Sequence, residues 1–466
     1  MGVSSLRLEK YIGSRTFYRK LYVILIPILI QNVITNFVNL LDNIMVGQVG
    51  TEPMSGVAIV NQLVFVYNLC ALGGLSGAGI LTAQFYGKDD VEGIRQTIRV
   101  KLLIGLGIFL IFGTVLWLCG DSFIRLFLHE GESGLDLEAT MRSAQDYLDV
   151  MLLQLLPFVV SMMYSSTLRE TGETVVPMTA GLIAVFVNLI FNYILIFGKL
   201  GAPALGVVGA AYATVLARVV EMMVVLVWTH RHTERNPFIS GVYQSLRVPR
   251  QVLRQAALLG LPLLVNELLW SGGMTVLNQC YSLRGLEVVS AMNIYITVSN
   301  LFFSAFIATG NATAIMVGQL LGAGELERAV DEDRKLIAFA FALSIALSVV
   351  MAATAPFFPQ IYNTIPRVKQ LATWILLIGA LLMPLHAFAN SCYFTLRSGG
   401  KTLITFIFDS GSLWLISIPA AFVIGHYMKI PIVPFFAIIE GLNLIKCLIG
   451  YVMVRQRHWV VNLVSE

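Results

Sequence analysis

The sequence predicts an all-α membrane protein in which twelve transmembrane helices form two pseudo-symmetric six-helix lobes around a central cleft. Three observations support this prediction: an apolar composition, twelve long apolar segments and a repeat that spans half of the chain. Of the 466 residues, 57% are hydrophobic and 12% are charged, whereas soluble proteins carry roughly 25% charged residues. So few charges cannot cover a water-facing surface, and we expect much of the surface to face lipid.

Each predicted helix rests on an apolar run, because crossing a bilayer takes roughly 20 apolar residues. In chain order these runs are 21–44, 56–82, 98–119, 145–168, 176–198, 206–228, 255–277, 290–318, 336–355, 371–395, 404–426 and 433–454. They are too long and too continuous for the strands of a membrane barrel. The first run is also too long for the apolar part of a signal peptide, so no cleavable leader is expected.

The distribution of Lys and Arg predicts the orientation of these helices. With the N-terminus inside, 22 basic residues fall in cytoplasmic segments and 7 in outer ones. Because cytoplasmic segments are the more basic ones, a multi-pass protein of the cell (inner) membrane with both termini in the cytoplasm is predicted. The net charge of +4 follows the same pattern, so membrane lipids are expected as partners and nucleic acid is not.

A repeat with a period of half the chain predicts two lobes of the same orientation. Four residues of the first half recur 235 positions later, namely Pro27 as Pro262, Gln84 as Gln319, Gly87 as Gly322 and Arg99 as Arg334. The segment 167–172 also matches 395–400. We therefore predict an N-terminal lobe at 1–228, a cytoplasmic linker at 229–254 and a C-terminal lobe at 255–466, related by an axis along the membrane normal, with a ligand site between the lobes.

Polar residues inside the predicted helices indicate an ion-coupling site in the N-terminal lobe. Asp42 lies late in the first helix with Asn39 one turn before it, Asn188 and Asn192 are one turn apart in the fifth, and Thr214 is in the sixth. A carboxylate at such a depth usually faces a cavity and has a function. Its oxygens, with amide and hydroxyl groups, suit sodium or a proton network. The alternatives are a structural carboxylate and ordinary interhelical hydrogen bonds.

A second group of polar residues, in the C-terminal lobe, is predicted to bind the substrate. Asn39 of the N-terminal lobe is predicted to bind it as well. Asn266 and Glu267 precede Trp270 by about one turn, and a carboxylate near an aromatic ring suits an organic cation. His386 and Asn390 are one turn apart. His386 could titrate near neutral pH, although a satisfied core histidine is the equal alternative.

Three more charged residues fall in predicted helices without suggesting a site. Asp409 is interpreted as structure near the cytoplasmic side, and Glu440 and Lys446 are six positions apart, so they do not stack on one helix face. The chain has no Walker loop, Gly-x-Ser-x-Gly or His-Glu-x-x-His motif, so no enzyme and no cofactor beyond a coupling ion, proton or sodium, is expected. The five cysteines show no metal-ligand spacing, and no metal site is predicted with certainty beyond sodium at Asp42, Asn188 and Asn192.

Several segments are specific enough to be compared with known families: Leu-Asp-Asn-Ile-Met-Val-Gly-Gln-Val-Gly at 41–50, Gly-Val-Val-Gly-Ala-Ala-Tyr-Ala-Thr at 206–214, Val-Gly-Gln-Leu-Leu-Gly-Ala-Gly at 317–324 and two Leu-Arg-x-x-Gly segments. In these segments, and over essentially its whole length, the sequence resembles the multidrug and toxic compound extrusion (MATE) family. The resemblance implies twelve helices in two lobes and export of drugs, often cationic, in exchange for protons or sodium.

The resemblance also assigns roles to residues. Asp42 matches the helix-1 aspartate implicated in ion coupling, Asn188 matches an asparagine of the same pocket, and Thr214 is matched to its helix-6 member. Asn192 stands where some members have a second aspartate. His386 falls at or near an aspartate of helix 10, and the helix-7 glutamate of some members falls closer to Trp270 than to Glu267.

These observations lead to one function and one alternative. The leading hypothesis is a secondary active efflux transporter, working as a monomer by alternating access, that exports small, cationic organic compounds in antiport with protons or sodium. The alternative is a flippase for lipid-linked precursors or polysaccharides of the same superfamily. A basic cavity would be expected for its phosphate head group, whereas the candidate residues here include the acids Asp42 and Glu267.

Overall fold

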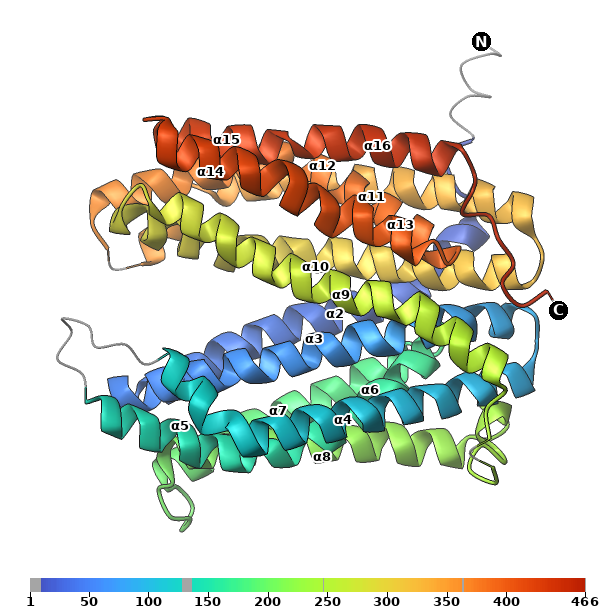
Figure 1. Cartoon of the computed structure of the whole chain (residues 1–466), viewed down its shortest axis with the longest axis horizontal. Helices are drawn as coiled ribbons and strands as arrows, with labels where there is room; N and C mark the ends of the chain where they lie inside the picture. Colours follow the sequence, from blue (N-terminus) through green and yellow to red (C-terminus); the bar gives the residue numbers. More distant parts are fainter. Residues whose placement is uncertain (1–9, 128–135, 246, 363, 466) are drawn as a thin grey trace. The chain divides into compact units, whose positions relative to one another are not determined.

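The computed structural model describes residues 10–127, 136–245, 247–362 and 364–465, and within these the side chains of residues 39, 40, 43 and 127 are not described. The first half of the chain forms α2 (Arg15–Gly47), α3 (Thr51–Gly87), α4 (Val91–Phe127), α5 (Leu137–Met151), η1 (Leu152–Gln154), α6 (Leu155–Glu170), α7 (Val175–Phe197), α8 (Gly206–Arg231) and η2 (Pro237–Ile239). The second half forms α9 (Arg250–Ser282), α10 (Leu286–Gly322), α11 (Leu326–Thr354), η3 (Phe358–Ile361), α12 (Pro366–Ser398), α13 (Thr402–Phe406), η4 (Ile407–Gly411), η5 (Leu413–Ser417), α14 (Ile418–Tyr427), α15 (Ile432–Gly441) and α16 (Asn443–Arg455) (Figure 1).

Within the described ranges, twelve helical stretches are long and apolar enough to cross a membrane, and no strand occurs. The predicted all-α membrane fold is therefore confirmed. The outer surface is itself apolar: Trp117 of α4 is 72% exposed, and only 11% of the most apolar window of this helix is buried. An apolar helix that packs so little against protein is expected to be covered by lipid. The arrangement of the helices around a central cleft stays a prediction.

Three predicted helices are interrupted in the structure. The segment 145–168 is α5, the 3₁₀ turn η1 and α6, because Pro157 lacks an N–H and its ring crowds the carbonyl of residue 153 inside η1. The segment 404–426 contains the π-helical turns η4 and η5, and Pro419 removes an N–H just beyond them. The segment 433–454 divides at Leu442 into α15 and α16, where the Asn443 amide Nδ2 donates to the Glu440 carbonyl at 3.1 Å.

The chain divides into two compact units. The N-terminal unit comprises Ile30–Thr82 and Asp90–Leu264, and the C-terminal unit comprises Met1–Leu29, Ala83–Asp89 and Val265–Glu466. Helices α2, α3 and α9 each contribute residues to both units. The predicted lobes 1–228 and 255–466 and their linker stay a prediction.

Each unit has its own apolar core. The core of the N-terminal unit includes Val60, Ile124 and Leu148, all almost fully buried. The largest core of the C-terminal unit includes Ile375 and Phe435, both fully buried. These cores fix the helices on which the polar residues of the two units stand.

The repeated Gln-x-x-Gly segments contact each other inside the C-terminal unit. A Cβ atom added at Gly87 would lie 1.8 Å from the carbonyl oxygen of Gln319, and one added at Gly322 would lie 1.9 Å from that of Gln84. The ends of α3 and α10 can therefore approach this closely only because both residues are glycine. The contact is reciprocal, since the glycine of each segment meets the glutamine of the other.

The segment that follows α16 is hydrogen-bonded to the same two Gln-x-x-Gly segments. The side chain of Gln84 donates to the carbonyl of Val461 at 3.3 Å and accepts from the backbone N–H of Leu463 at 2.7 Å. The Asn462 amide donates to the carbonyl of Gly322 at 3.2 Å. We call residues 459–464 the C-terminal strap.

Candidate functional site

The candidate site of the N-terminal unit is built from α2, α7 and α8. Two glycines bring α7 and α8 together: Gly198 ends α7 with a positive φ of 64°, and a Cβ atom at Gly209 would lie 2.6 Å from the Leu195 backbone. Asn188 and Asn192 are buried on the resulting face of α7. Asp42 comes from the last turns of α2 and is half-buried.

A chain of hydrogen bonds joins all four residues that the sequence predicts for ion coupling. The amide Nδ2 of Asn192 donates to Oδ1 of Asp42 at 2.7 Å and lies 3.1 Å from Oδ1 of Asn188. Nδ2 of Asn188 donates to the Thr214 hydroxyl at 3.3 Å. That hydroxyl donates to the carbonyl of Ala210 at 3.0 Å. The structure thus brings these four side chains together from three helices, and their role in ion coupling stays a prediction.

The Asn188 amide can also be turned by 180°, which exchanges its donor and its acceptor. Turned by 180°, its Nδ2 donates to both carboxylate oxygens of Asp42, at 2.8 and 2.9 Å, while its oxygen accepts from the Thr214 hydroxyl at 3.3 Å. An amide carries a donor and an acceptor of nearly equal size. Rotation of this one group therefore allows the site to face either an ionised or a neutral carboxyl at Asp42.

One oxygen of the site is available to a small cation. Oδ1 of Asn192 is buried and has no hydrogen-bond partner among the described residues, and the whole residue is only 1% exposed. A buried oxygen of this kind is costly unless water or an ion satisfies it. Like the oxygens of Asp42 and Thr214, it is a hard oxygen of the kind that sodium accepts as a ligand.

Two further groups surround Asp42. Arg218 of α8 interacts electrostatically with it and also forms an ion pair with Glu221 at 2.7 Å. Tyr147 of α5 is buried, interacts electrostatically with Asp42 and donates to Oδ1 of Asn61 at 3.3 Å. The sequence analysis did not identify these residues, because spacing along one helix does not show that Arg218 of the sixth predicted helix or Tyr147 of the fourth faces Asp42 of the first. The side chain of Asn39, predicted to bind substrate, lies outside the described part of the structure.

In the C-terminal unit, Asn266 belongs to a tight network instead of standing alone. Its Nδ2 donates to Oδ2 of Asp409 at 3.1 Å and lies 3.5 Å from the Tyr393 hydroxyl. Its Oδ1 accepts from the hydroxyl of Ser410 at 2.7 Å. Lys446 of α16 closes the network by donating to Oδ1 of Asp409 at 2.5 Å. The amide of Asn266 is thus already used inside the protein.

Glu267 and Trp270 do not enter this network through any hydrogen bond recorded for the described residues. Glu267 is half-buried and interacts electrostatically with Arg397 and Asp409. Trp270 is 42% exposed. Substrate binding by either residue stays a prediction.

His386 and Asn390 of α12 have different partners. Nε2 of His386 lies 2.6 Å from Oε2 of Glu440 on α15, whereas Nδ2 of Asn390 donates to the carbonyl of Phe306 at 2.8 Å. The sequence analysis missed the pairs His386–Glu440 and Asp409–Lys446. The signal that could have found them is the presence of opposite charges at similar depth in different helices.

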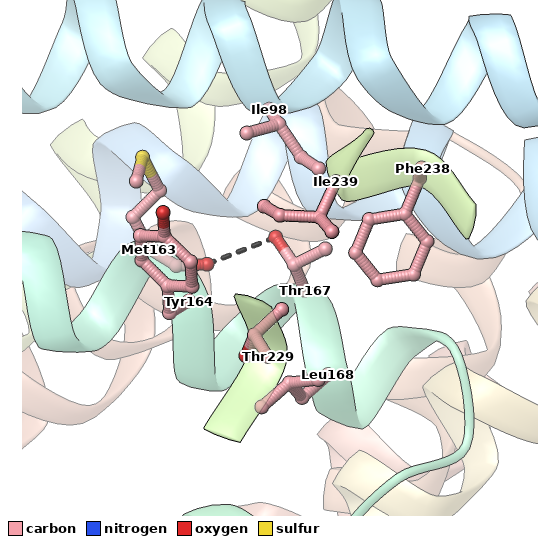
Figure 2. A pocket seen from close by; sticks show the side chains of 8 residues that line it. All are labelled: Ile98, Met163, Tyr164, Thr167, Leu168, Thr229, Phe238 and Ile239. Atoms are coloured by element: carbon pink, nitrogen blue, oxygen red, sulfur yellow. Dashed lines mark hydrogen bonds between the residues drawn. The ribbon is translucent and has the colours of Figure 1, made fainter. Parts of the chain in front are cut away.

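The N-terminal unit also contains a small pocket between α4, α6, α8 and η2 that is separate from Asp42 (Figure 2). Its floor carries the Thr167 hydroxyl, which donates to the carbonyl of Met163 at 2.9 Å and accepts from Lys101 at 3.0 Å. The lining consists of Ile98, Met163, Tyr164, Thr167, Leu168, Thr229, Phe238 and Ile239. These mostly apolar side chains do not form an ion site.

Comparisons with known proteins agree with the geometry. A probable multidrug resistance protein, NorM, of Thermotoga maritima is 26% identical over 422 residues, which cover 88% of this chain and 86% of that protein. The multidrug resistance protein MdtK of Edwardsiella ictaluri is 25% identical over 415 residues, covering 87% of each chain.

Among solved structures, the outward-facing conformation of a multidrug resistance MATE family transporter matches with a TM-score of 0.86 at 20% identity, covering 96% of this chain and 97% of that one. A MOP superfamily transporter from Pyrococcus furiosus matches with a TM-score of 0.84, also at 20% identity, over 96% of this chain and 97% of that one. These likenesses show the fold. The family model described as MatE matches residues 27–194 and 262–423, which is more than half of the residues, and the chain belongs to the MatE family.

Proposed function

We propose that this multi-pass membrane protein is a multidrug efflux transporter that exports small organic cations in exchange for protons or sodium. The observation that carries the proposal is the Asp42 carboxylate, held by Asn192 at 2.7 Å next to two buried amides and a half-buried hydroxyl. The names of the relatives, which are multidrug resistance proteins, support efflux. We further propose that one chain is the working unit and that both termini lie in the cytoplasm.

The site suits ion exchange because the Asp42 carboxylate is hydrogen-bonded by the neutral Asn192 amide and also interacts electrostatically with Arg218, so both interactions depend on its charge. Asp42 is on α2, and its hydrogen-bond partner Asn192 is on α7. The neighbouring Asn188 of α7 is hydrogen-bonded to Thr214 of α8. Neutralising Asp42, by a proton or by sodium, weakens the hydrogen bonds that it accepts. The charge of one side chain thereby changes how three helices are held together.

Alternating access follows if the ion binds one conformation better than the other. A ligand shifts a conformational equilibrium only by its difference in affinity for the two states. We propose that the coupling ion favours one state by binding at Asp42, and that the organic cation favours the other. Both states would then be visited in each transport cycle, driven by the ion gradient.

The test is ethidium transport by reconstituted vesicles with an imposed proton gradient, sodium gradient or neither. Asp42→Asn removes the charge with little change in shape, so we expect gradient-driven transport to fall to the level of protein-free vesicles. The control is Asp146→Asn, which changes an exposed acid of α5 in the same unit and should transport normally. Normal transport by the Asp42 variant would show that this carboxylate is not the coupling group.

The same assay separates the two coupling ions and the alternative substrate. Transport driven by sodium at uniform pH supports direct sodium binding by Asp42, Asn188 and Asn192, and transport driven only by a pH gradient supports a proton. If neither gradient moves ethidium but the protein transfers lipid-linked phosphates between leaflets, the flippase alternative replaces this proposal.

A further inference from the structure

We infer that His386 and Glu440 form a second proton-binding site, located in the C-terminal unit. This inference rests on the proposed antiport and adds a proton that Asp42 does not carry. Nε2 of His386 lies 2.6 Å from Oε2 of Glu440, and the two side chains are 25% and 13% exposed. At this distance a proton lies between the two atoms, because a ring nitrogen without hydrogen and a carboxylate oxygen would repel each other.

A proton alone is sufficient as the ligand of the His386–Glu440 pair. With one shared proton the pair is neutral overall, either as imidazolium with carboxylate or as imidazole with carboxylic acid. Losing that proton leaves one net negative charge, which is costly inside a helix bundle at membrane depth. The pair is therefore expected to keep its proton while it is enclosed and to release it when water and substrate reach it.

In the described part of the chain, no Lys or Arg side chain forms an ion pair with Glu440. Asn443 of α16 places its amide nitrogen 3.5 Å from Nε2 of His386 and 3.4 Å from Oε2 of Glu440. Two phenols interact electrostatically with Glu440, those of Tyr281 of α9 and Tyr295 of α10. Within the described ranges, the only ion pair of Glu440 is the one with His386.

On the remaining side, α10 contributes an apolar wall. The ring of Phe303 meets the His386 ring edge-on, with centroids 5.4 Å apart. One turn along α12, the Asn390 amide is bound to the carbonyl of Phe306 at 2.8 Å. Histidine is therefore the only basic group that these contacts offer to the carboxylate, and it is the side chain that ordinarily changes charge near neutral pH.

The neighbouring pair of Asp409 and Lys446 shows the contrasting arrangement. Nζ of Lys446 donates to Oδ1 of Asp409 at 2.5 Å, and the Asn266 amide donates to Oδ2 at 3.1 Å. Both oxygens are therefore satisfied by donors of the protein itself, and the ammonium supplies a lasting charge. By contrast, the hydrogen bonds recorded for the Glu440 carboxylate all reach Oε2.

The pair lies next to the break between helices α15 and α16. Glu440 lies in the last turn of α15, and Asn443 begins α16 after the break at Leu442. The Asn443 amide donates to the Glu440 carbonyl at 3.1 Å and also faces the shared proton. Release of the proton changes the hydrogen-bond partner of the Asn443 amide. We therefore expect the resulting conformational change to begin at the break between α15 and α16.

Infrared difference spectroscopy of the purified full chain tests the site directly. The background is Asp42→Asn, so that Asp42 does not contribute, and spectra are compared between about pH 5 and pH 8, where imidazole titrates. We expect carboxyl and imidazole bands that disappear with Glu440→Gln and with His386→Gln. The matched control combines Asp409→Asn with Lys446→Met, which removes the neighbouring pair as a unit and should leave those bands in place.

Transport supplies a second readout in vesicles with wild-type Asp42. The number of protons exchanged per ethidium, obtained from the pH gradient at which net flux stops, should fall by one in Glu440→Gln. Unchanged spectra and an unchanged proton count in this variant overturn the inference. If His386→Gln does not yield a monodisperse protein, the nearly isosteric Glu440→Gln decides alone.

The two proposals fail in different ways. Loss of coupling in Asp42→Asn together with unchanged Glu440→Gln spectra retains the proposed function and rejects the second site. Normal transport by Asp42→Asn rejects the role of Asp42, whereas the infrared bands of the pair remain a direct measure of proton binding by His386 and Glu440.

Discussion

At the scale of single residues, the Asp42 carboxylate receives its 2.7 Å hydrogen bond from a neutral amide, that of Asn192. Asn192→Ala removes this donor and opens a small buried space. We expect a loss of about 1–3 kcal/mol of stability from the unsatisfied carboxylate, together with weaker ion coupling. Thermal unfolding in detergent and ethidium transport measure the two effects. Thr179→Ala, at an exposed position of α7, is the control and should change neither.

Lys101 provides a second test at this scale, because it is fully buried and pairs with Glu170 at 2.5 Å. Removing one partner of a buried ion pair typically costs about 3–5 kcal/mol, whereas replacing both is much cheaper. Lys101→Met should therefore lower the melting temperature strongly, and adding Glu170→Gln should restore much of it. Additive effects of the two substitutions would contradict a direct interaction between these side chains.

The sequence was sufficient to predict that Asn188, Asn192 and Thr214 gather at Asp42, but not that Arg218 and Tyr147 join them, nor which charges pair in the C-terminal unit. Asn188 and Asn192 are one turn apart, so helical spacing alone places them on one face. Asp409 and Lys446 belong to different helices, and their pairing depends on how each helix is rotated about its axis. The π-helical turn that contains Asp409 changes this rotation in a way that no periodicity reveals.

At the scale of helices, close crossings depend on glycine at particular positions. Gly87→Ala places a methyl group 1.8 Å from a backbone oxygen of α10, so the helices must separate. We expect a cost of a few kcal/mol, as for overpacked cores, visible as a lower melting temperature. Gly107→Ala in α4 is the matched control, since an added Cβ meets nothing within 4 Å there. It should be neutral or stabilising by up to about 1 kcal/mol.

Helix existence was easier to predict than helix continuity. The twelve apolar runs are set by the thickness of the bilayer, and all twelve appear as spans among the described residues. The interruptions depend on local competition for backbone hydrogen bonds, for example by Pro157, or by Asn443, whose amide donates to the backbone of the preceding helix. The apolar content of a segment therefore does not predict where its helix is interrupted.

At the scale of the whole molecule, the C-terminal strap ties the last residues of the chain to residues near position 84. Ending the chain after Arg457 removes the bonds of the strap to Gln84 and Gly322, as well as the 2.6 Å bond from Lys88 to the Val464 carbonyl. At about 1 kcal/mol for each hydrogen bond, plus the burial of Trp459, we expect a clearly lower melting temperature.

The control for this truncation ends the chain after Val464, which removes only the final two residues. Because that shorter deletion leaves the bonds of the strap in place, it should retain the stability of the full chain. Equal melting temperatures for the long truncation and the full chain would contradict a structural role for the strap.

The reciprocal contact of Gly87 with Gln319 and of Gly322 with Gln84 has a consequence for ancestry. A surface in which residue i meets residue j and the copy of j meets the copy of i is the signature of an isologous dimer. If a single six-helix gene preceded the duplication, its Gln-x-x-Gly segment could have bound the same segment of a sister chain. Fusion of the two genes would then have preserved an interface that already existed.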